Sequence, residues 1–281
     1  MIKYYSICGK RISIESPLPI TEHENFSVFA TEEGKTDIQI TYNIGESLPH
    51  IPGESKTAQN GSLVSSSGGT IYRNTPMGVA QGALSCYSYD DISHSQVYFT
   101  KNSYNCMSDY RYMWNSVSLG QLLLPFKILL FHASYISFND SAILFSAQCG
   151  VGKSTQAELW RKHKGAEVIN GDKAGVSVTA EGVFAHGLPF CGTSGICKNK
   201  SLPLKAIVLL SQAPENKITR LSGVNVIQSL ISNIYLDFIA PGETQHCVDT
   251  LIELLKTVPV YHLQCTPDEK AVECLAKELG E

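Results

Sequence analysis

The chain has 281 residues, of which 43% are hydrophobic and 17% are charged, and its formal net charge at pH 7 is −4. This composition is too apolar and too weakly charged for a disordered protein, and the acidic balance argues against a sequence-independent nucleic-acid binder, which needs a basic surface. The length suggests one large domain or two smaller ones.

The cysteine pattern and the apolar segments bear on where the protein works. The nine cysteines contain no C-x-x-C pair, which predicts small buried thiols in a reducing cytosol rather than a disulfide framework or a structural zinc site. Residues 1–16 contain no signal-peptide stretch, and polar residues interrupt the apolar run at 119–136. We therefore expect a cytoplasmic protein with no membrane partner and no nucleic-acid partner.

Residues 1–112 are predicted to form a smaller, β-rich N-terminal domain. Apolar residues alternate with polar ones over 38–44, which is the period of a half-buried strand. Residues 63–72 surround a Ser- and Gly-rich turn, which predicts a hairpin, and 97–100 is a further strand pattern. No chemical motif occurs here, so recruitment of a substrate is the candidate role of this domain.

Residues 113–281 are predicted to form an α/β domain, because helical and strand patterns alternate along them. The first predicted elements are a helix at 119–130, strands at 131–136 and 142–146, a loop at 147–152, a helix at 153–163 and a strand at 168–169. A strand at 205–210, helices at 227–234 and 248–255 and a strand at 260–265 follow. A capping box at 266–269, with proline at the first helical position, predicts a last helix that ends at residue 279.

The sharpest chemical signal is the segment 147–154, with the sequence AQCGVGKS, between a predicted strand and a predicted helix. It fits the phosphate-loop pattern G-x-x-x-x-G-K-[ST] at every position except the first, where alanine replaces glycine. Gly150 and Gly152 allow the backbone to curl so that its N–H groups face phosphate oxygens, and the helix start adds its positive dipole end. Lys153 then reaches the β and γ phosphates, and the Ser154 hydroxyl can ligate Mg²⁺.

We therefore predict that the protein binds ATP with Mg²⁺. The predicted nucleotide-binding residues are Gln148, Cys149, Gly150, Val151, Gly152, Lys153, Ser154 and Thr155. A GTPase is disfavoured, because the order of residues at Asn170 does not match the base-reading motif N-K-x-D and no aspartate follows Asn199-Lys200 at the required position. Cys149 is either an oxidation-sensitive thiol or simply a small loop residue.

Asp172 and His132 are candidate catalytic residues on either side of the phosphate loop in the sequence. Asp172 lies 19 residues after Lys153, at the end of a predicted strand, where a carboxylate belongs in a phosphoryl-transfer site; a simple turn after Asn170-Gly171 is the alternative. His132 lies at the start of the strand before the loop, and a buried core histidine is the alternative there. The predicted catalytic residues are Asp172, His132 and Lys153, and the predicted metal ligands are Ser154 and Asp172.

Residues 119–281 resemble the catalytic domain of HPr kinase/phosphorylase. His132 precedes Ala147 by fifteen residues, as the family's histidine precedes its first loop position, and G-V-G-K-S at 150–154 matches the core of the family's loop. A glycine, a strand and Asp172 then follow in the family's order. The resemblance implies an α/β phosphate-loop kinase domain of the HPr kinase and phosphoenolpyruvate carboxykinase type, which phosphorylates a protein hydroxyl.

The sequence departs from HPr kinase at one functional position. The family has a pair of aspartates whose first member is the usual general base, whereas this chain has Gly171 followed by Asp172. The HPr-kinase-like proteins encoded beside ribosomal-peptide maturation genes, lasso-peptide kinases among them, carry a similar I-N-G-D stretch, found here at 169–172, and 187–192 and 199–207 also resemble that group. HPr kinases assemble as hexamers, and a homo-oligomer is an open alternative for this chain.

Three functions are compatible with these residues. The first is an ATP- and Mg²⁺-dependent kinase that phosphorylates a Ser or Thr hydroxyl of a peptide or small protein, with Asp172, alone or with His132, orienting or deprotonating the acceptor. The second is an ATP-binding module without phosphoryl transfer, and the third is a kinase that acts on a small hydroxy compound. Lys198 and Lys200 are candidates for contacts with the γ-phosphate, with solvated surface lysines as the alternative.

Overall fold

The computed structural model describes residues 1–21, 23–58, 60–77, 80–108 and 110–281. The chain divides into two compact units, the first made of Met1–Phe126 and Leu236–His246 and the second of Lys127–Tyr235 and Cys247–Glu281. The boundary that we expected after residue 112 falls inside helix α3 (Tyr110–Ser116), which packs on strands of the first unit. The first unit therefore continues to Phe126 and gains a second, later segment of the chain.

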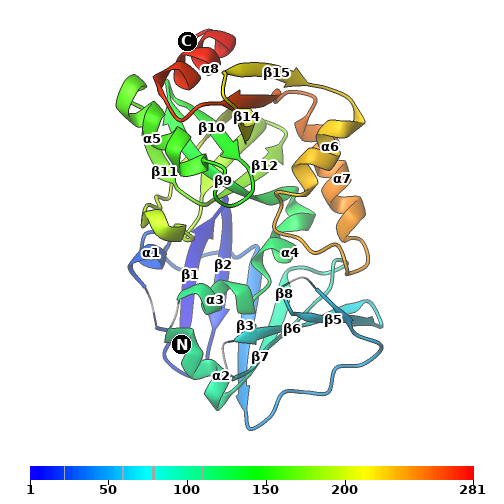
Figure 1. The fold of residues 1–281 in the computed structure, drawn as a ribbon. Coiled ribbons are helices and arrows are strands. Elements are labelled where there is room, and N and C mark those ends of the chain that lie inside the picture. The colour runs from blue at the N-terminus through cyan, green and yellow to red at the C-terminus, as the bar shows by residue number, and fades with distance from the viewer. Residues whose placement is uncertain (22, 59, 78–79, 109) are drawn as a thin grey trace. The chain divides into compact units, whose positions relative to one another are not determined.

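The first unit contains a β-sheet, in agreement with the β-rich composition of the N-terminal residues. Among the residues that the structure describes, its eight strands follow the order β1-β2-β3-β8-β7-β6-β5-β4, with parallel pairing for β2–β3 and β3–β8 and antiparallel pairing elsewhere. Their bounds are β1 (Ile2–Ile7), β2 (Lys10–Glu15), β3 (Ile38–Gly45), β4 (Lys56–Thr57), β5 (Leu63–Ser67), β6 (Thr70–Met77), β7 (Ala80–Tyr87) and β8 (His94–Thr100). Figure 1 shows these strands in blue and cyan.

The local sequence explains why these strands form. In β3 the alternation buries Ile38, Ile40 and Tyr42, as predicted. The predicted hairpin is also confirmed: β5 and β6 pair across Gly68-Gly69, both with positive φ, which glycine adopts without strain. The helical segments of this unit before Lys127 are α1 (Glu24–Ser27), α2 (Lys101–Asn105), η1 (Cys106–Ser108), α3 (Tyr110–Ser116), α4 (Leu119–Leu123) and η2 (Leu124–Phe126).

A buried ion-pair cluster holds the later segment, Leu236–His246, within the first unit. The Arg73 guanidinium on β6 donates to the carboxylates of Asp237 and Glu243, with 2.9 Å to the latter, and Arg73 and Glu243 are almost fully buried. Glu243 Oε2 accepts the backbone N–H groups of Ile239 and Ala240 at 3.0 and 3.2 Å. Both carboxylate oxygens are thus satisfied, which offsets the cost of burying the charge.

The second unit is built on a mixed sheet in which two long strands each change partners. In the described residues its strands are β9 (Ile128–Phe138), β10 (Ser141–Ser146), β11 (Glu167–Asn170), β12 (Lys173–Thr179), β13 (Gly182–Gly187), β14 (Ser201–Gln212), β15 (Lys217–Leu221) and β16 (Val260–Cys265). The pairing order is β10-β9-β12-β13-β14-β16-β15, β11 also pairs with β9, and β14 returns to β10. Only β10–β14 and β14–β16 are parallel among the described pairs, so the unit is mixed α/β.

Two helices cover the parallel part of this sheet. The helices of this part of the chain are α5 (Lys153–Lys164), α6 (Val224–Ile231), α7 (Glu243–Leu254), which begins in the first unit and ends in the second, and α8 (Glu269–Leu279). Helices α5 and α8 pack on each other (Figure 1). Trp160 of α5 is fully buried, 5.3 Å from the ring of Phe138 and 6.3 Å from that of Phe145. In the described part of the chain, no helix is both long and apolar enough to cross a membrane.

The helix predicted at 119–130 is wrong in its second half. Helix α4 ends at Leu123, a 3-10 turn follows, and Lys127 has φ +56, after which β9 begins at Ile128. Pro125 lacks the N–H that would continue the helix, and the left-handed residue reverses the chain into the strand. Apolar residues buried on both faces do not distinguish a strand from a helix by their spacing, which caused the error.

The predicted capping box at 266–269 is also wrong. Helix α8 begins at Glu269, and its N-cap is Asp268, whose side chain accepts the N–H of Lys270 at 3.1 Å. Thr266 is instead paired with Asn216, through one bond to its hydroxyl at 2.9 Å and one from its N–H at 3.0 Å. A long-range amide partner therefore takes the threonine that the local pattern assigned to the cap.

Among the described residues of the second unit, three strands lie where the sequence analysis placed no element. They are β12, β13 and β15, the first two forming a hairpin that carries a buried histidine. His186 lies between two hydroxyls, with Nε2 2.8 Å from Ser177 Oγ and Nδ1 2.7 Å from Ser201 Oγ. Burial lowers its pKa to about 4, so the imidazole is neutral at pH 7.

Candidate functional site

The phosphate-loop sequence lies between β10 and α5, as predicted. Gly150 has φ +81 and Gly152 has φ +125, values that L side chains rarely adopt. A Cβ built on either glycine would meet no heavy atom of the described residues within 4 Å, so the loop borders open space. Gly152 is the N-cap of the 12-residue helix α5. The free N–H groups of a helix start beside an open loop fit a phosphate group.

Lys153 is drawn into the loop. Its side chain is almost fully buried, and its Nζ donates to the carbonyl oxygens of Ala147 at 3.0 Å and Gln148 at 3.4 Å. Burial lowers the pKa of Lys153, and the charge of Asp172 acts in the opposite direction. The carbonyls of the loop therefore hold an ammonium group at its base.

The other predicted loop residues are accessible. Gln148, Cys149, Ser154 and Thr155 are exposed, and Val151 is half-buried. The Ser154 hydroxyl points to the turn before Asp172, since its Oγ donates to Gly171 O at 3.5 Å. The structure thus brings the two predicted metal-ligand positions, residues 154 and 172, to adjoining parts of the chain.

Asp172 and His132 lie together. His132 Nε2 is 3.4 Å from Asp172 Oδ1, and both side chains are about one-quarter to one-third exposed. The contact with His132 lowers the pKa of Asp172, and the charges of Lys173 and Lys153 act in the same direction, against the effect of burial. Asp172 is therefore a carboxylate at neutral pH.

The turn that presents Asp172 is made by a different residue. Asn170 is fully buried, and its Oδ1 accepts the N–H groups of Asp172 and Lys173, both at 2.9 Å, while its Nδ2 donates to Leu188 O at 2.7 Å. This Asx-type turn links β11 to β12. The side chain of Asn170, and not that of Asp172, therefore forms the turn that we considered as the alternative role of Asp172. The Asp172 side chain faces His132 instead.

His132 is fixed by backbone contacts on β9. Its N–H donates to Asn233 O at 2.8 Å, and its carbonyl accepts the hydroxyl of Ser146, the last residue of β10, at 2.9 Å. The next residue, Ala133, donates to Asp172 O at 3.0 Å. The strand that precedes the phosphate loop and the turn that follows β11 are thus both bonded to the chain at His132 and Ala133.

The sequence analysis missed an aromatic and cationic group at this site. The Nζ of Lys173 lies 4.5 Å from the ring centroid of Phe190 and 4.3 Å from that of Tyr235, and the Tyr235 ring is 5.8 Å from that of His132. Burial lowers the pKa of Lys173, against the charge of Asp172. Tyr235 is held by its N–H, which donates to Leu130 O at 2.8 Å. No local pattern marks these residues, because they are distant in sequence.

The space beside Gly171 is filled by a neighbouring segment. A Cβ built on Gly171 would lie 2.6 Å from Ser194 Cβ, and the Ser194 hydroxyl donates to Cys191 O at 2.7 Å. Gly192, with φ +54, packs beside Asp172 so closely that a Cβ there would lie 2.7 Å from that of Asp172. The segment 191–195 therefore fills the space that a carboxylate at position 171 would need.

Lys198 and Lys200 are occupied by another partner. Their Nζ atoms lie 2.6 and 2.7 Å from the two carboxylate oxygens of Glu167, at the start of β11. These half-exposed ion pairs agree with the surface-lysine alternative. The structure therefore does not bring these two lysines to the loop, where we considered them as contacts for the γ-phosphate.

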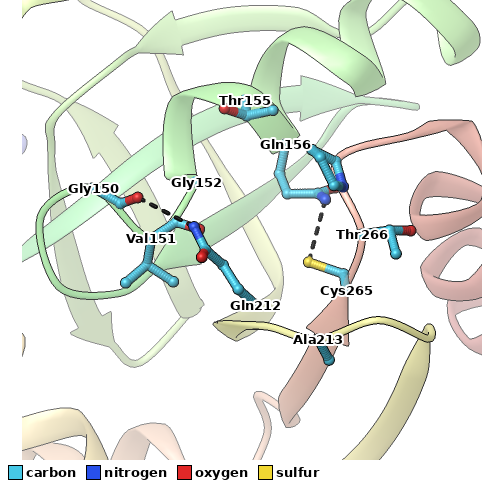
Figure 2. Close-up of a pocket in the computed structure, with 10 residues that line it drawn as sticks. Gly150, Val151, Gly152, Thr155, Gln156, Gln212, Ala213, Cys265 and Thr266 are labelled. Atoms are coloured by element: carbon cyan, nitrogen blue, oxygen red, sulfur yellow. Dashed lines mark hydrogen bonds between the residues drawn. The ribbon is translucent and has the colours of Figure 1, made fainter.

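A cavity of about 500 Å³ opens beside the phosphate loop. It lies between the loop with the first turn of α5 and the chain that follows β14 and β16 (Figure 2). Its lining residues are Gly150, Val151, Gly152, Thr155, Gln156, Gln212, Ala213, Cys265, Thr266 and Pro267. Of these, only the loop residues and Thr155 were expected from the sequence, since the rest are brought there by the parallel pairing of β14 and β16.

Comparison with known proteins gives matches to solved structures alone. No model of a known protein family matches the chain, and no curated protein matches it. Among solved structures, the chain is similar to the Hpr(Ser) kinase/phosphatase from Coxiella burnetii, with 9% sequence identity and a TM-score of 0.32. The match covers 53% of this chain and 94% of that one.

Proposed function

We propose that the protein is an ATP-dependent kinase that transfers the γ-phosphoryl group to a Ser or Thr hydroxyl of a peptide or small protein. The observation that carries this proposal is the meeting of three elements in the second unit. They are the phosphate-loop sequence between β10 and α5, the Ser154 hydroxyl 3.5 Å from Gly171 O, and the Asp172–His132 pair. A HPr-kinase-like activity on ribosomally made peptides is the form of this proposal that the sequence resemblance favours.

The loop residues would hold the nucleotide. The N–H groups around Gly150 and Gly152 would bind phosphate oxygens, and the Lys153 ammonium would leave the carbonyls of Ala147 and Gln148 for the β and γ phosphates. Ser154 and Asp172 offer two hard oxygen ligands suited to Mg²⁺. When bound, Mg²⁺ would neutralise charge on the phosphates.

The transfer step needs little covalent work from the protein. The acceptor oxygen forms a bond to the γ-phosphorus, the bond from that phosphorus to the bridging oxygen breaks, and ADP leaves. The proton of the acceptor hydroxyl passes to the Asp172 carboxylate or, through it, to His132. Since the pKa of Asp172 is lowered, its main contribution would be to orient the hydroxyl and to hold it against the phosphorus.

The test is phosphate transfer from γ-labelled ATP with Mg²⁺ to a mixed library of Ser- and Thr-containing peptides. Lys153→Ala and Asp172→Asn should each lower the rate at least about 100-fold, a typical loss for a group that stabilises transition-state charge. Lys162→Ala is the matched control, because Lys162 is an exposed lysine on the same helix. Label in a peptide that persists in Lys153→Ala would contradict the proposal.

A second candidate, an ATP-binding module without transfer, is favoured by the closed position at Gly171. A kinase of the HPr type has its general base there, and this chain has neither the carboxylate nor the space for one. The module predicts nucleotide binding with only free phosphate, or with no turnover, in the same assay. Labelled peptide that depends on Lys153 would exclude this alternative.

A further inference from the structure

Lys173 carries a positive charge beside the Asp172–His132 pair that the proposed function does not use. The residue is the first of β12, directly after Asp172, and it lies opposite His132 in the antiparallel pairing of β12 with β9. Residues directly opposite in such a pair project their side chains to the same face of the sheet. Lys173 and His132 therefore share a face, next to the Asp172 carboxylate that lies 3.4 Å from the imidazole.

Two aromatic rings hold the Lys173 ammonium in place. Its Nζ lies 4.5 Å from the ring centroid of Phe190 and 4.3 Å from that of Tyr235, within the range of a cation–π interaction. The Tyr235 ring is in turn 5.8 Å from that of His132. The faces of the rings attract the cation without supplying an oxygen acceptor, so they fix its position and leave its N–H donors for another group.

The donors of this ammonium have no oxygen partner in the part of the chain that the structure describes. Lys153 Nζ donates to a carbonyl at 3.0 Å and Lys200 Nζ to a carboxylate at 2.7 Å, whereas no such oxygen lies within hydrogen-bond distance of Lys173 Nζ among the described residues. The side chain is half-buried. Burial lowers the pKa of Lys173, and the charge of Asp172 acts in the opposite direction. An anion bound beside this amine would favour its charged form and offset the cost of its burial.

We propose that the Lys173 ammonium binds the oxygens of the phosphoryl group while that group passes from ATP to the acceptor hydroxyl, which makes Lys173 a catalytic residue. The inference rests on the proposed function, because it needs a phosphoryl group that is transferred at Asp172. Besides the contact with the imidazole, the charges of Lys173 and Lys153 lower the pKa of Asp172, so its carboxylate lies near both ammonium groups. Lys153 belongs to the loop that would hold the leaving ADP, and Lys173 lies on the side of the pair that would orient the acceptor.

The charge that Lys173 would neutralise develops during the transfer. The bond from the γ-phosphorus to the bridging oxygen breaks as the bond to the acceptor oxygen forms, and negative charge spreads over the three equatorial oxygens of the phosphoryl group. ADP takes the electron pair of the broken bond, and the acceptor proton passes to Asp172. A cation fixed on the acceptor side binds these oxygens more strongly in the transition state than in bound ATP, and only such a difference raises the rate of the step.

A purely structural role for the ammonium makes a different prediction. If its task were only to fill the space between the rings of Phe190 and Tyr235, an apolar side chain of similar length would replace it. Methionine is unbranched and packs well against aromatic rings. Lys173→Met therefore removes the charge with little loss of packing, and Lys173→Arg keeps a charge that still stacks on the rings.

The test is equilibrium binding of ADP to the full chain by calorimetry, with Mg²⁺ present and with or without aluminium fluoride. Aluminium fluoride bound beside ADP imitates the phosphoryl group in transfer, and transition-state mimics bind more tightly than ground-state ligands. Lys173→Met should leave the affinity for ADP alone within about 2-fold and weaken the aluminium fluoride complex at least about 10-fold. Lys173→Arg should retain more of that complex than Lys173→Met does. Lys162→Met, at an exposed lysine on α5, is the matched control and should change neither affinity.

A peptide that accepts label in the kinase assay allows a second measurement. Lys173→Met should then lower kcat and leave the KM for ATP unchanged, because the lost contact is made only in the transition state. A loss confined to the KM for the peptide would place Lys173 at the acceptor itself and would overturn the inference.

The outcomes separate this inference from the proposed function. An aluminium fluoride complex that is undiminished in Lys173→Met would overturn the role of Lys173 while phosphoryl transfer stands. Equal weakening of ADP binding with and without aluminium fluoride would show a structural effect, which also overturns it. If the unmodified protein binds no ADP, or gains no affinity from aluminium fluoride, the proposed function itself fails, and the role of Lys173 fails with it.

Discussion

Replacing Gly171 by alanine tests the closed position next to Asp172. The added Cβ would lie 2.6 Å from Ser194 Cβ, and real Cβ atoms essentially never approach so closely. Gly171 does not have a positive φ, so the backbone itself accepts alanine. The perturbation is therefore steric, and rotation of the Ser194 hydroxyl alone does not relieve it, because the close contact is with the Cβ atom.

The expected cost follows from what must move. Overpacking by one methyl group costs about 1–3 kcal/mol in the free energy of unfolding. Ser194→Gly alone loses the hydroxyl bonds to Cys191 O at 2.7 Å and from Ile196 N at 3.2 Å, which costs about 1 kcal/mol each. In the double variant Gly171→Ala, Ser194→Gly the clash is gone. Its loss of unfolding free energy should therefore be about 1–2 kcal/mol smaller than the sum of the losses in the two single variants.

Urea unfolding of the four proteins measures this coupling. Gly45→Ala is the control, because a Cβ on Gly45 would have its nearest neighbour at 3.5 Å, an ordinary contact, and the φ of Gly45 is not positive. That control should change stability by less than about 1 kcal/mol. Additive costs in the double variant, or a Gly171→Ala protein as stable as the unmodified one, would refute the steric argument and reopen position 171 to a carboxylate.

Three further predictions use other parts of the chain. ATP should protect the exposed thiol of Cys149 from alkylation, because the thiol lies in the loop that would hold the phosphates. Mass spectrometry of the peptide that contains Cys149 measures the alkylation, and equal labelling with and without ATP would contradict this prediction. The free energy of unfolding should fall by up to about 3 kcal/mol as the pH is lowered from 6.5 to about 4. Burial lowers the pKa of His186 in the folded protein, so that on acidification His186 is protonated in the unfolded chain before it is protonated in the folded one. Urea titrations of His186→Gln should lack this part of the pH dependence. Arg73→Met should cost about 3–5 kcal/mol by leaving the buried Glu243 carboxylate without its charge partner, against less than about 1 kcal/mol for Lys101→Met, which breaks an exposed pair; equal melting temperatures for the two variants would contradict the argument.

Elements with a strong local signal were predictable. The alternation in β3, the glycine turn between β5 and β6, the helix after the phosphate loop and the strand β16 are each specified by residues adjacent in sequence. The helix over 119–130 failed because a strand buried on both faces has no period that separates it from a helix. The β12–β13 hairpin did have a signal, the alternation of Val176 and Val178 with smaller or polar neighbours, which the sequence analysis did not use.

The candidate site likewise contains residues that the sequence indicated and residues that it did not. The phosphate loop is local and was predictable, and the sequence spacing of His132 and Asp172 led to two residues that the structure places 3.4 Å apart, while their catalytic roles stay predictions. Lys173, Tyr235 and Gln156 gave no signal, because their environment is made by chain segments that only folding brings together. Closure of position 171 by Ser194 is likewise a property of packing.

The pairing of β9 predicts how fast the amides at the candidate site exchange with solvent. Within its eleven residues the strand is bonded to β12, β11, β10 and the chain at 233–235, and its main partner changes between His132 and Ala133. The amide of His132 donates to Asn233 O at 2.8 Å and that of Ala133 to Asp172 O at 3.0 Å, in the middle of a strand that is paired along its length. Their exchange should therefore be as slow as unfolding of the whole unit, whereas amides of the exposed loop at 148–150 exchange by local opening. The candidate site thus combines a strand paired along its length, which carries His132, with an exposed loop at 148–150.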